Sequence, residues 1–210
     1  MNDEGITIAA VGDIALMQKP RRKLWTDVWN LADIRLANLE APIVEYPGPP
    51  ADKFIRIKQP VEAGEWLQEL NITAVSLANN HMMDWGNEGL RQTFSSLYKN
   101  EIKFSGAGNN IEEAAKPCMI EVKGYKIAFL SWSSTVPKGF QALSDRAGIA
   151  SVRIKNSYEI DSNIADEQPG TPPWVHTEPM EEDLQHLEKV IKYVQEDADF
   201  IILAIHWGIP

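Results

Sequence analysis

Short apolar segments that end abruptly in polar side chains constrain the fold of this chain more than any other feature. The clearest case is residues 74–86, AVSLANNHMMDWG, in which an apolar run gives way to Asn79, Asn80 and His81. Such a run is typical of a buried parallel strand, and open α/β sheets bind ligands beyond the carboxyl ends of these strands. Asparagine offers a carbonyl oxygen and histidine an imidazole nitrogen, so both can bind a metal ion. The alternative is that Asn79 and Asn80 form only a turn.

Three further apolar segments end in the same way. They span residues 6–11, 34–37 and 200–205, and the last has the unbroken apolar character of a fully buried strand. The polar residues that follow them are Asp13, Asn38 with Glu40, and His206. Each type is also common in loops, but strand ends that converge in one sheet would gather all of them around one crevice. Two divalent cations bridged by a carboxylate would suit this mixture of oxygen and nitrogen donors.

The segments between these strands predict an α/β fold. Apolar residues recur at helical spacing in residues 61–70, 87–100 and 181–196. Residues 118–122 and 126–130 are rich in β-forming side chains and flank a turn that contains Gly124, which predicts a β-hairpin. Antiparallel pairing therefore joins the otherwise alternating order of strands and helices.

Three segments rich in Pro, Gly or Ser predict long loops, namely residues 42–60, 131–149 and 157–179. Residues 53–58 directly follow the Pro-rich part of the first of these loops and carry three basic side chains, two of which are Lys53 and Arg56. We expect Lys53 and Arg56 to supply a positive pocket for an anionic substrate. The alternative is a solvent-exposed edge strand whose charges prevent it from pairing with other chains.

Composition narrows the classes of function and partner. With 210 residues, of which 44% are apolar, the chain is expected to fold as one domain over residues 1–210. Its formal net charge of -10 repels phosphate backbones, so nucleic acid is not an expected partner. The single cysteine, Cys118, excludes an intramolecular disulfide and leaves the compartment open. We find neither an apolar run of membrane-spanning length nor an export signal, which indicates either a cytoplasmic protein or a chain trimmed at its N-terminus.

Several motifs, in their order and spacing, resemble the CapA family of capsule and poly-gamma-glutamate synthesis proteins. They are GDIALM at 12–17, ANLEAPI at 37–43, SLANNHMMDWGNEGL at 76–90, GAGNN at 106–110 and AIHWGIP at 204–210. That family is similar in fold to calcineurin-like metallophosphoesterases. The resemblance therefore implies a metallophosphoesterase-like mixed β-sheet sandwich flanked by helices. Family members are often anchored outside the cell, so it also implies an extracellular or membrane-associated protein.

The resemblance also implies roles for individual residues. The implied metal ligands are Asp13, Glu40, Asn80 and His206, with Glu40 as the carboxylate that bridges two ions. The implied cofactors are accordingly one or two divalent ions such as Mn, Fe, Zn or Mg. The implied catalytic residues are His81, as acid/base or transition-state stabiliser, and Asp84, which supports it.

The sequence departs from the family pattern at two places. Metallophosphoesterases have a histidine two residues after the first aspartate, and this chain has Ala15 there. The family also continues beyond the HWG motif with further strands and additional metal ligands, so we expect either that the chain is truncated at its C-terminus or that its site is completed by something else. An apolar strand at that end would leave an open face over residues 200–210, through which we expect the chain to self-associate.

Three functions remain open at this stage. The first is a metal-dependent hydrolase that activates water to cleave a small phosphoester or a gamma-glutamyl amide bond. The second is a non-catalytic accessory module of capsule assembly that binds an anionic polymer. The third is a structural α/β domain whose polar strand ends are caps and turns.

Overall fold

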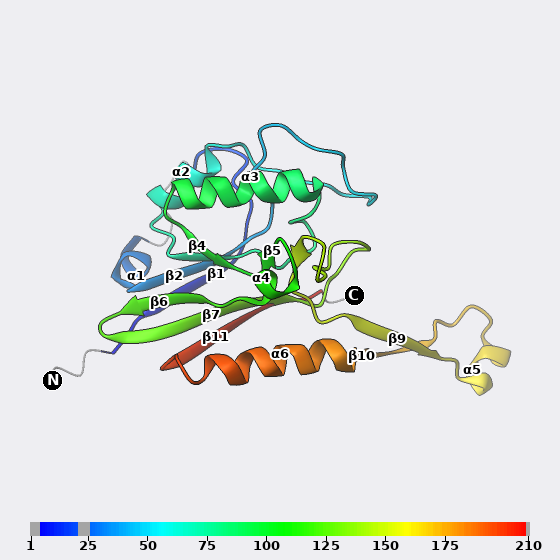
Figure 1. Ribbon diagram of the computed structural model, residues 1–210. Helices are drawn as coiled ribbons and strands as arrows, with labels where there is room; N and C mark the ends of the chain where they lie inside the picture. The colour runs from blue at the N-terminus through cyan, green and yellow to red at the C-terminus, as the bar shows by residue number, and fades with distance from the viewer. Residues whose placement is uncertain (1–4, 21–25, 209–210) are drawn as a thin grey trace.

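Two β-sheets packed face to face form the centre of the molecule (Figure 1). The computed structural model describes residues 5–20 and 26–208. The first sheet is parallel and has the order β1 (Ile8–Ile14), β2 (Ile34–Leu39), β3 (Ala74–Ser76), β4 (Lys103–Ser105). The second has the order β11 (Phe200–His206), β7 (Tyr125–Ser133), β6 (Cys118–Val122).

The predicted β-hairpin is confirmed. Strands β6 and β7 pair antiparallel, whereas β11 pairs parallel to β7. The hairpin turn needs left-handed backbone, and Lys123 and Gly124 adopt φ values of 50° and 83°. The second sheet is therefore mixed, as expected for the fold class.

Both faces of the central strands β2, β3 and β7 are largely buried, which explains their nearly continuous apolar character. On β2, Ile34 and Leu36 pack with Phe129 of β7 in the cluster between the two sheets. Leu39, on the opposite face of β2, belongs with Leu90 to the cluster beneath the helices. A strand with one polar face could not fill this position.

Helices cover the outer faces of the two sheets (Figure 1). The first sheet packs against α2 (Ala63–Glu69) and α3 (Gly86–Lys99), and the second against α4 (Ile111–Ala115) and α6 (Glu181–Val194). The three helices predicted over residues 61–70, 87–100 and 181–196 are thus confirmed as α2, α3 and α6. A short helix, α1 (Thr26–Leu31), joins β1 to β2. The resulting helix–sheet–sheet–helix arrangement confirms the α/β fold class and is compatible with a metallophosphoesterase-like fold.

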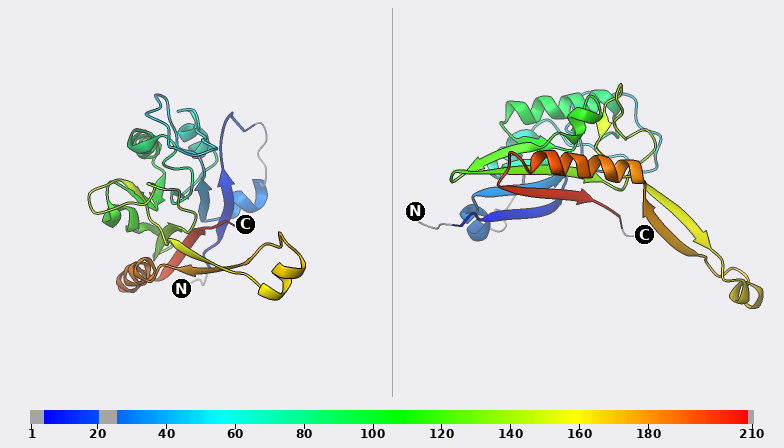
Figure 2. Two further views of the ribbon diagram at one scale, coloured as in Figure 1. Left: turned by 90° about the vertical axis from the view of Figure 1, so that its right-hand side faces the viewer. Right: turned by 60° about the horizontal axis from the view of Figure 1, so that its bottom comes forward.

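The prediction of a loop over residues 157–179 is wrong. These residues belong to an arm that projects from the body of the molecule, made of β9 (Ile154–Glu159), α5 (Ser162–Glu167) and β10 (Trp174–Pro179) (Figure 2). The two strands pair antiparallel, with Tyr158 opposite Val175. The Pro and Gly residues that suggested a loop lie mainly between α5 and β10, beyond the paired strands.

The prediction of a loop over residues 131–149 also needs correction at both ends. Residues 131–149 begin as the end of β7 and finish in a short strand, β8 (Gly148–Ile149), which pairs with β5 (Ala107–Gly108). Residues 53–58, all described, lie in a loop, as predicted for residues 42–60, and the alternative of an edge strand is wrong.

Strand β11 is less buried than its sequence predicts. Among the described residues it pairs with β7 alone, so it is an edge strand, and Phe200 and Ile205 are 53% and 48% exposed. β11 therefore has an open edge, but its two faces are partly buried, since Ile202 packs in the cluster between the sheets and Leu203 packs in the cluster that contains Leu187 of α6. Residues 209 and 210 lie outside the described residues. In the described part of the chain we find no helix with the length and apolar character needed to span a bilayer.

Candidate metal centre

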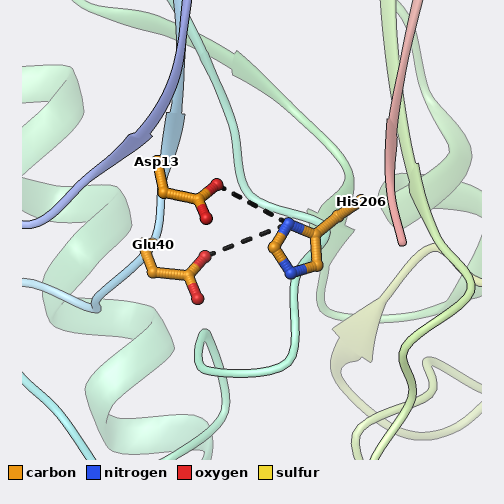
Figure 3. A group of neighbouring side chains, drawn as sticks. All are labelled: Asp13, Glu40 and His206. Atoms are coloured by element: carbon orange, nitrogen blue, oxygen red, sulfur yellow. Dashed lines mark ion pairs between the residues drawn. The ribbon is translucent and has the colours of Figure 1, made fainter. Parts of the chain in front are cut away.

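Asp13, Glu40 and His206 come together where three strands end (Figure 3). Each offers one ligand atom, and these atoms all lie within 4.8 Å of one another. Parallel pairing of β1 with β2 places Asp13 opposite Asn38, two residues before Glu40. His206 is the last residue of β11, so the second sheet brings the third ligand to the same place. The sequence pattern of polar residues at strand ends thus corresponds to a spatial cluster.

The backbone of β1 differs from the prediction in one respect. Asp13 was expected just after the strand, but β1 continues to Ile14 and its register with β2 shifts between Ala10 and Asp13. Such an irregularity changes the direction of the side chains that follow it. Asp13 therefore extends toward the cluster from within the strand.

The side chain of Asn38 links the two carboxylates. Its amide Nδ2 donates hydrogen bonds of 2.7 Å to Asp13 Oδ1 and 2.8 Å to Glu40 Oε2. Its Oδ1 accepts a hydrogen bond of 3.1 Å from Asn79 Nδ2, which fixes the orientation of the amide. Two carboxylates are therefore held side by side with one neutral donor between them.

The electrostatics of the cluster favour a cation. Burial, followed by repulsion from Asp13, raises the pKa of Glu40, although the hydrogen bond from Asn38 opposes this shift. Burial lowers the pKa of His206 and outweighs the opposing effect of Asp13. Metal ions bind carboxylates and neutral imidazole, and a cation would offset the repulsion between the two carboxylates. The donor set thus fits the implied divalent ion.

Asn80 holds the imidazole of His206. Its Oδ1 lies 2.9 Å from His206 Nε2 and can act only as an acceptor, so Nε2 carries the proton. The other nitrogen, Nδ1, faces Asp13 Oδ1 at 3.8 Å and Glu40 Oε2 at 4.0 Å. The sequence predicts Asn80 as a metal ligand, and in this arrangement it lies beside the cluster and orients His206.

Asn79 stabilises a turn, as the alternative interpretation of Asn79 and Asn80 predicts. Its Oδ1 accepts hydrogen bonds from the backbone N–H groups of His81, at 3.0 Å, and Met82, at 2.9 Å. This side chain therefore shapes the turn after β3 and is completely buried. The same turn directs Asn80 and His81 toward the cluster.

His81 and Asp84 form a hydrogen-bonded pair next to the cluster. His81 Nδ1 lies 2.6 Å from Asp84 Oδ2, and His81 Nε2 lies 3.8 Å from Glu40 Oε1. Because a carboxylate accepts, Nδ1 donates its proton to Asp84, which leaves the Nε2 lone pair free on the side of Glu40. The structure therefore brings both sequence-predicted catalytic residues to the predicted metal ligands.

The two predicted substrate-binding residues differ in their surroundings. Lys53 Nζ lies 2.8 Å from Asp84 Oδ1, and its side chain is only 16% exposed. Arg56 is exposed and donates hydrogen bonds to the backbone oxygens of Ala51 and Lys53. Of these two residues, therefore, only Arg56 presents its charged group to solvent.

The sequence analysis did not predict the buried position of Gln59 or the ion pair between Lys53 and Asp84. Gln59 is completely buried and hydrogen-bonds to the backbone of Leu16 and of Ala41, which ties together the segments that follow β1 and β2. Nothing in the local sequence distinguishes Gln59 from an exposed loop residue. Its contacts arise from chain segments that lie far apart in the sequence.

The chain is similar to a known protein family and to individual proteins of several bacteria. The profile of the bacterial capsule synthesis protein family PGA_cap matches residues 7–210. The PGA biosynthesis protein CapA of Bacillus subtilis is 27% identical over 161 residues, covering 70% of this chain and 42% of that protein. The capsule biosynthesis protein CapA of Bacillus anthracis is 23% identical over 158 residues, covering 75% of this chain and 32% of that protein.

A third relative carries a different description. A protein of Mycobacterium tuberculosis described as a probable polyglutamine synthesis accessory protein is 29% identical over 104 residues, covering 45% of this chain and 27% of that protein. The chain thus matches less than half the length of each of these three relatives.

Proposed function

This chain belongs to the bacterial capsule synthesis protein family PGA_cap, and on that basis we propose that it is a metal-dependent hydrolase of phosphoester or gamma-glutamyl amide bonds. The observation that carries the proposal is the cluster of Asp13, Glu40 and His206, with donor atoms within 4.8 Å of one another. Asp13, Glu40 and His206 would hold the ion, and Asn80 would serve as a further ligand or orient His206. A bound divalent cation supplies Lewis acidity, which lowers the pKa of water and neutralises charge on a phosphoryl or acyl oxygen.

His81 is the proposed acid/base group. Its Nδ1–H is held by Asp84, so the ring presents Nε2 toward Glu40 and the space where a reacting bond would lie. An imidazole held by a buried carboxylate in this way is oriented for proton transfer at the other nitrogen. His81 would accept a proton from water or donate one to the leaving group.

The proposed substrate is anionic. Arg56 is an exposed cation in the same loop as Lys53, whose ammonium group contacts the His81 and Asp84 pair. In a chain with a formal net charge of -10, an anionic substrate needs such a local cation or the metal ion itself. Poly-gamma-glutamate and phosphoesters both meet this description.

A second candidate is an accessory module that binds an anionic polymer without cleaving it. Two observations favour it. The position at which metallophosphoesterases have a histidine is Ala15, which offers no ligand. One relative is itself described as a probable accessory protein. A site with a weakened second metal position could still bind an anionic chain.

Turnover assays separate the two candidates. The purified protein is analysed for metal and then assayed on a generic phosphodiester and on a gamma-glutamyl peptide, with Mn²⁺ or with EDTA. The hydrolase predicts Mn²⁺-dependent turnover that His81→Gln abolishes and His176→Gln, on the exposed arm, leaves unchanged. Stoichiometric metal without turnover of either substrate would instead support the accessory module.

A further inference from the structure

Lys53 makes an unusual set of contacts for a lysine in an irregular loop. Its Nζ pairs with Asp84 Oδ1 at 2.8 Å and donates to the backbone oxygen of Asn80. Nζ also lies 3.2 Å from His81 Nδ1, a contact that is not a hydrogen bond when Nδ1 carries the proton. The Lys53 side chain is 16% exposed and that of Asp84 is 0% exposed. The ammonium group of Lys53 therefore contacts residues next to the candidate metal centre and is largely shielded from solvent.

Asp84 has a partner on each of its oxygens. Oδ1 pairs with Lys53, while Oδ2 accepts hydrogen bonds from His81 Nδ1 at 2.6 Å and from the backbone N–H of Ile57 at 2.8 Å. A completely buried carboxylate needs such compensation, and Lys53 is its cationic partner. Loss of Lys53 would leave the Asp84 charge buried and without its counter-ion.

Hydrogen bonds join the loop that carries Lys53 to Asp84 and Trp85. The backbone N–H of Ala51 donates to Asp84 O at 2.9 Å, and Trp85 Nε1 donates to Ile57 O at 2.9 Å. The ring of Phe140 lies on another side of Lys53, with its centroid 5.2 Å from Nζ. The ammonium group is thus held from several directions and is directed away from solvent.

We propose that Lys53 is a positioning residue and does not bind substrate. By pairing with Asp84 it keeps that carboxylate oriented as an acceptor for His81 Nδ1–H, which directs the Nε2 lone pair of His81 toward Glu40. That this lone pair takes part in a reaction rests on the proposed function. The effect of Lys53 on the orientation and tautomer of the His81 imidazole does not. The inference reassigns Lys53 from the substrate-binding role that its sequence predicts.

The test is the tautomer of His81 in the metal-free protein, measured by long-range ¹⁵N–¹H NMR with ¹⁵N-labelled histidine. The chain has four histidines, so His81→Gln assigns the signal. The wild type is expected to show Nδ1–H, and Asp84→Asn, whose amide can donate to Nδ1, provides the Nε2–H reference. Lys53→Met is expected to lose the Nδ1–H signal, whereas Lys53→Arg retains it.

A matched control lies in the same loop. Lys58 is exposed and packs over the ring of Trp85, 5.8 Å from its centroid, so Lys58→Met removes one charge without touching Asp84. It should leave the His81 signal unchanged. If Lys53→Met does not fold, Lys53→Gln replaces it with the same expected loss. An unchanged Nδ1–H signal in a folded, neutral Lys53 variant would overturn the proposal.

Kinetics provide a second readout wherever the wild type turns over a substrate. Lys53→Met should lower kcat by about 10- to 100-fold, the range for residues that orient a ligand or catalytic group, with KM within about twofold. Higher KM with unchanged kcat would contradict the positioning role, since loss of a substrate contact produces that pattern. Absence of turnover in the wild type would count against the proposed function, and the NMR result would still decide the role of Lys53.

Discussion

Asn80 Oδ1 lies 2.9 Å from Nε2 of His206, although the two residues are 126 positions apart in the chain. Asn80 follows β3 of the first sheet, and His206 ends β11 of the second. The hydrogen bond therefore connects the two sheets at the edge where their strands end. It also selects the tautomer in which His206 Nδ1 faces Asp13 and Glu40, so a contact between sheets determines the chemistry of the cluster.

Asn38→Ala should destabilise the metal-free protein more than the metal-loaded one. The substitution removes the amide that donates to Asp13 and Glu40, and loss of such hydrogen bonds to charged groups costs about 1.5–3 kcal/mol. A bound cation would offset part of this cost because it also neutralises both carboxylates. Thermal denaturation with EDTA and with Mn²⁺ measures the difference. Asn156→Ala, on the exposed strand β9, is the control, and equal losses with and without Mn²⁺ would contradict the prediction.

Asp183→Asn should make the free energy of unfolding depend less on pH in the acid range. Burial acts to raise the pKa of Asp183, but the hydrogen bonds from Arg153 prevail and the pKa lies below its usual value of 3.8. A lowered carboxyl pKa stabilises the folded state above pH 3.8, and this contribution is lost as pH falls through the lower, folded pKa.

Denaturation of the wild type and of Asp183→Asn between pH 2 and pH 7 measures this contribution. The variant should be less stable at pH 7 by about 1.5–3 kcal/mol, the usual contribution of hydrogen bonds to a charged group. The difference should shrink toward the acid end of the range. A difference that stays constant with pH would show that Asp183 does not act through its charge.

The arm should be dispensable for folding and for the metal centre. Every residue of β9 and β10 is exposed, and Ile154 pairs directly with Pro179 at the base of the arm. A short Gly-Ser linker can therefore replace residues 155–178 without straining the chain. The shortened protein should melt within a few degrees of the wild type and bind Mn²⁺ equally well. An unfolded product would show that the arm contributes to the core.

The edge strand β11 should promote self-association. Phe200 is 53% exposed at the start of this strand, whose outer edge is unpaired among the described residues. Phe200→Lys places a charge there and should shift the protein toward the monomer in sedimentation experiments across a range of concentrations. Val28→Lys, at a side chain that is 70% exposed on α1, is the control. A wild type that remains monomeric at high concentration would refute the expectation.

The order of elements could be predicted from local patterns, because short apolar runs and helical spacing directly reflect burial. The cluster of Asp13, Glu40 and His206 followed from one additional rule, that parallel strands end at a common edge. Two features could not be predicted. An unbroken apolar run such as residues 200–205 does not reveal whether the strand lies at an edge, and a Pro- and Gly-rich segment can connect a paired ribbon.

The roles of Lys53 and Gln59 also could not be predicted from local sequence patterns. Both residues lie in an irregular loop, and both find their partners through the packing of distant segments. Charge and loop position suggested an exposed cation at Lys53, but a buried Asp84 thirty-one residues later required a counter-ion. Side chains that compensate buried charges depend on the tertiary structure and leave no periodic signal in the sequence.

Calorimetric titration with Mn²⁺ is the most direct test of the metal centre. The wild type should bind the ion stoichiometrically, and His206→Ala should weaken the affinity by more than about 100-fold, the upper end of the effect of losing a group that only orients a ligand. His176→Ala, at an exposed histidine of β10, should bind as the wild type does. Equal Mn²⁺ affinity of His206→Ala and the wild type would contradict the assignment of Asp13, Glu40 and His206 as a metal site.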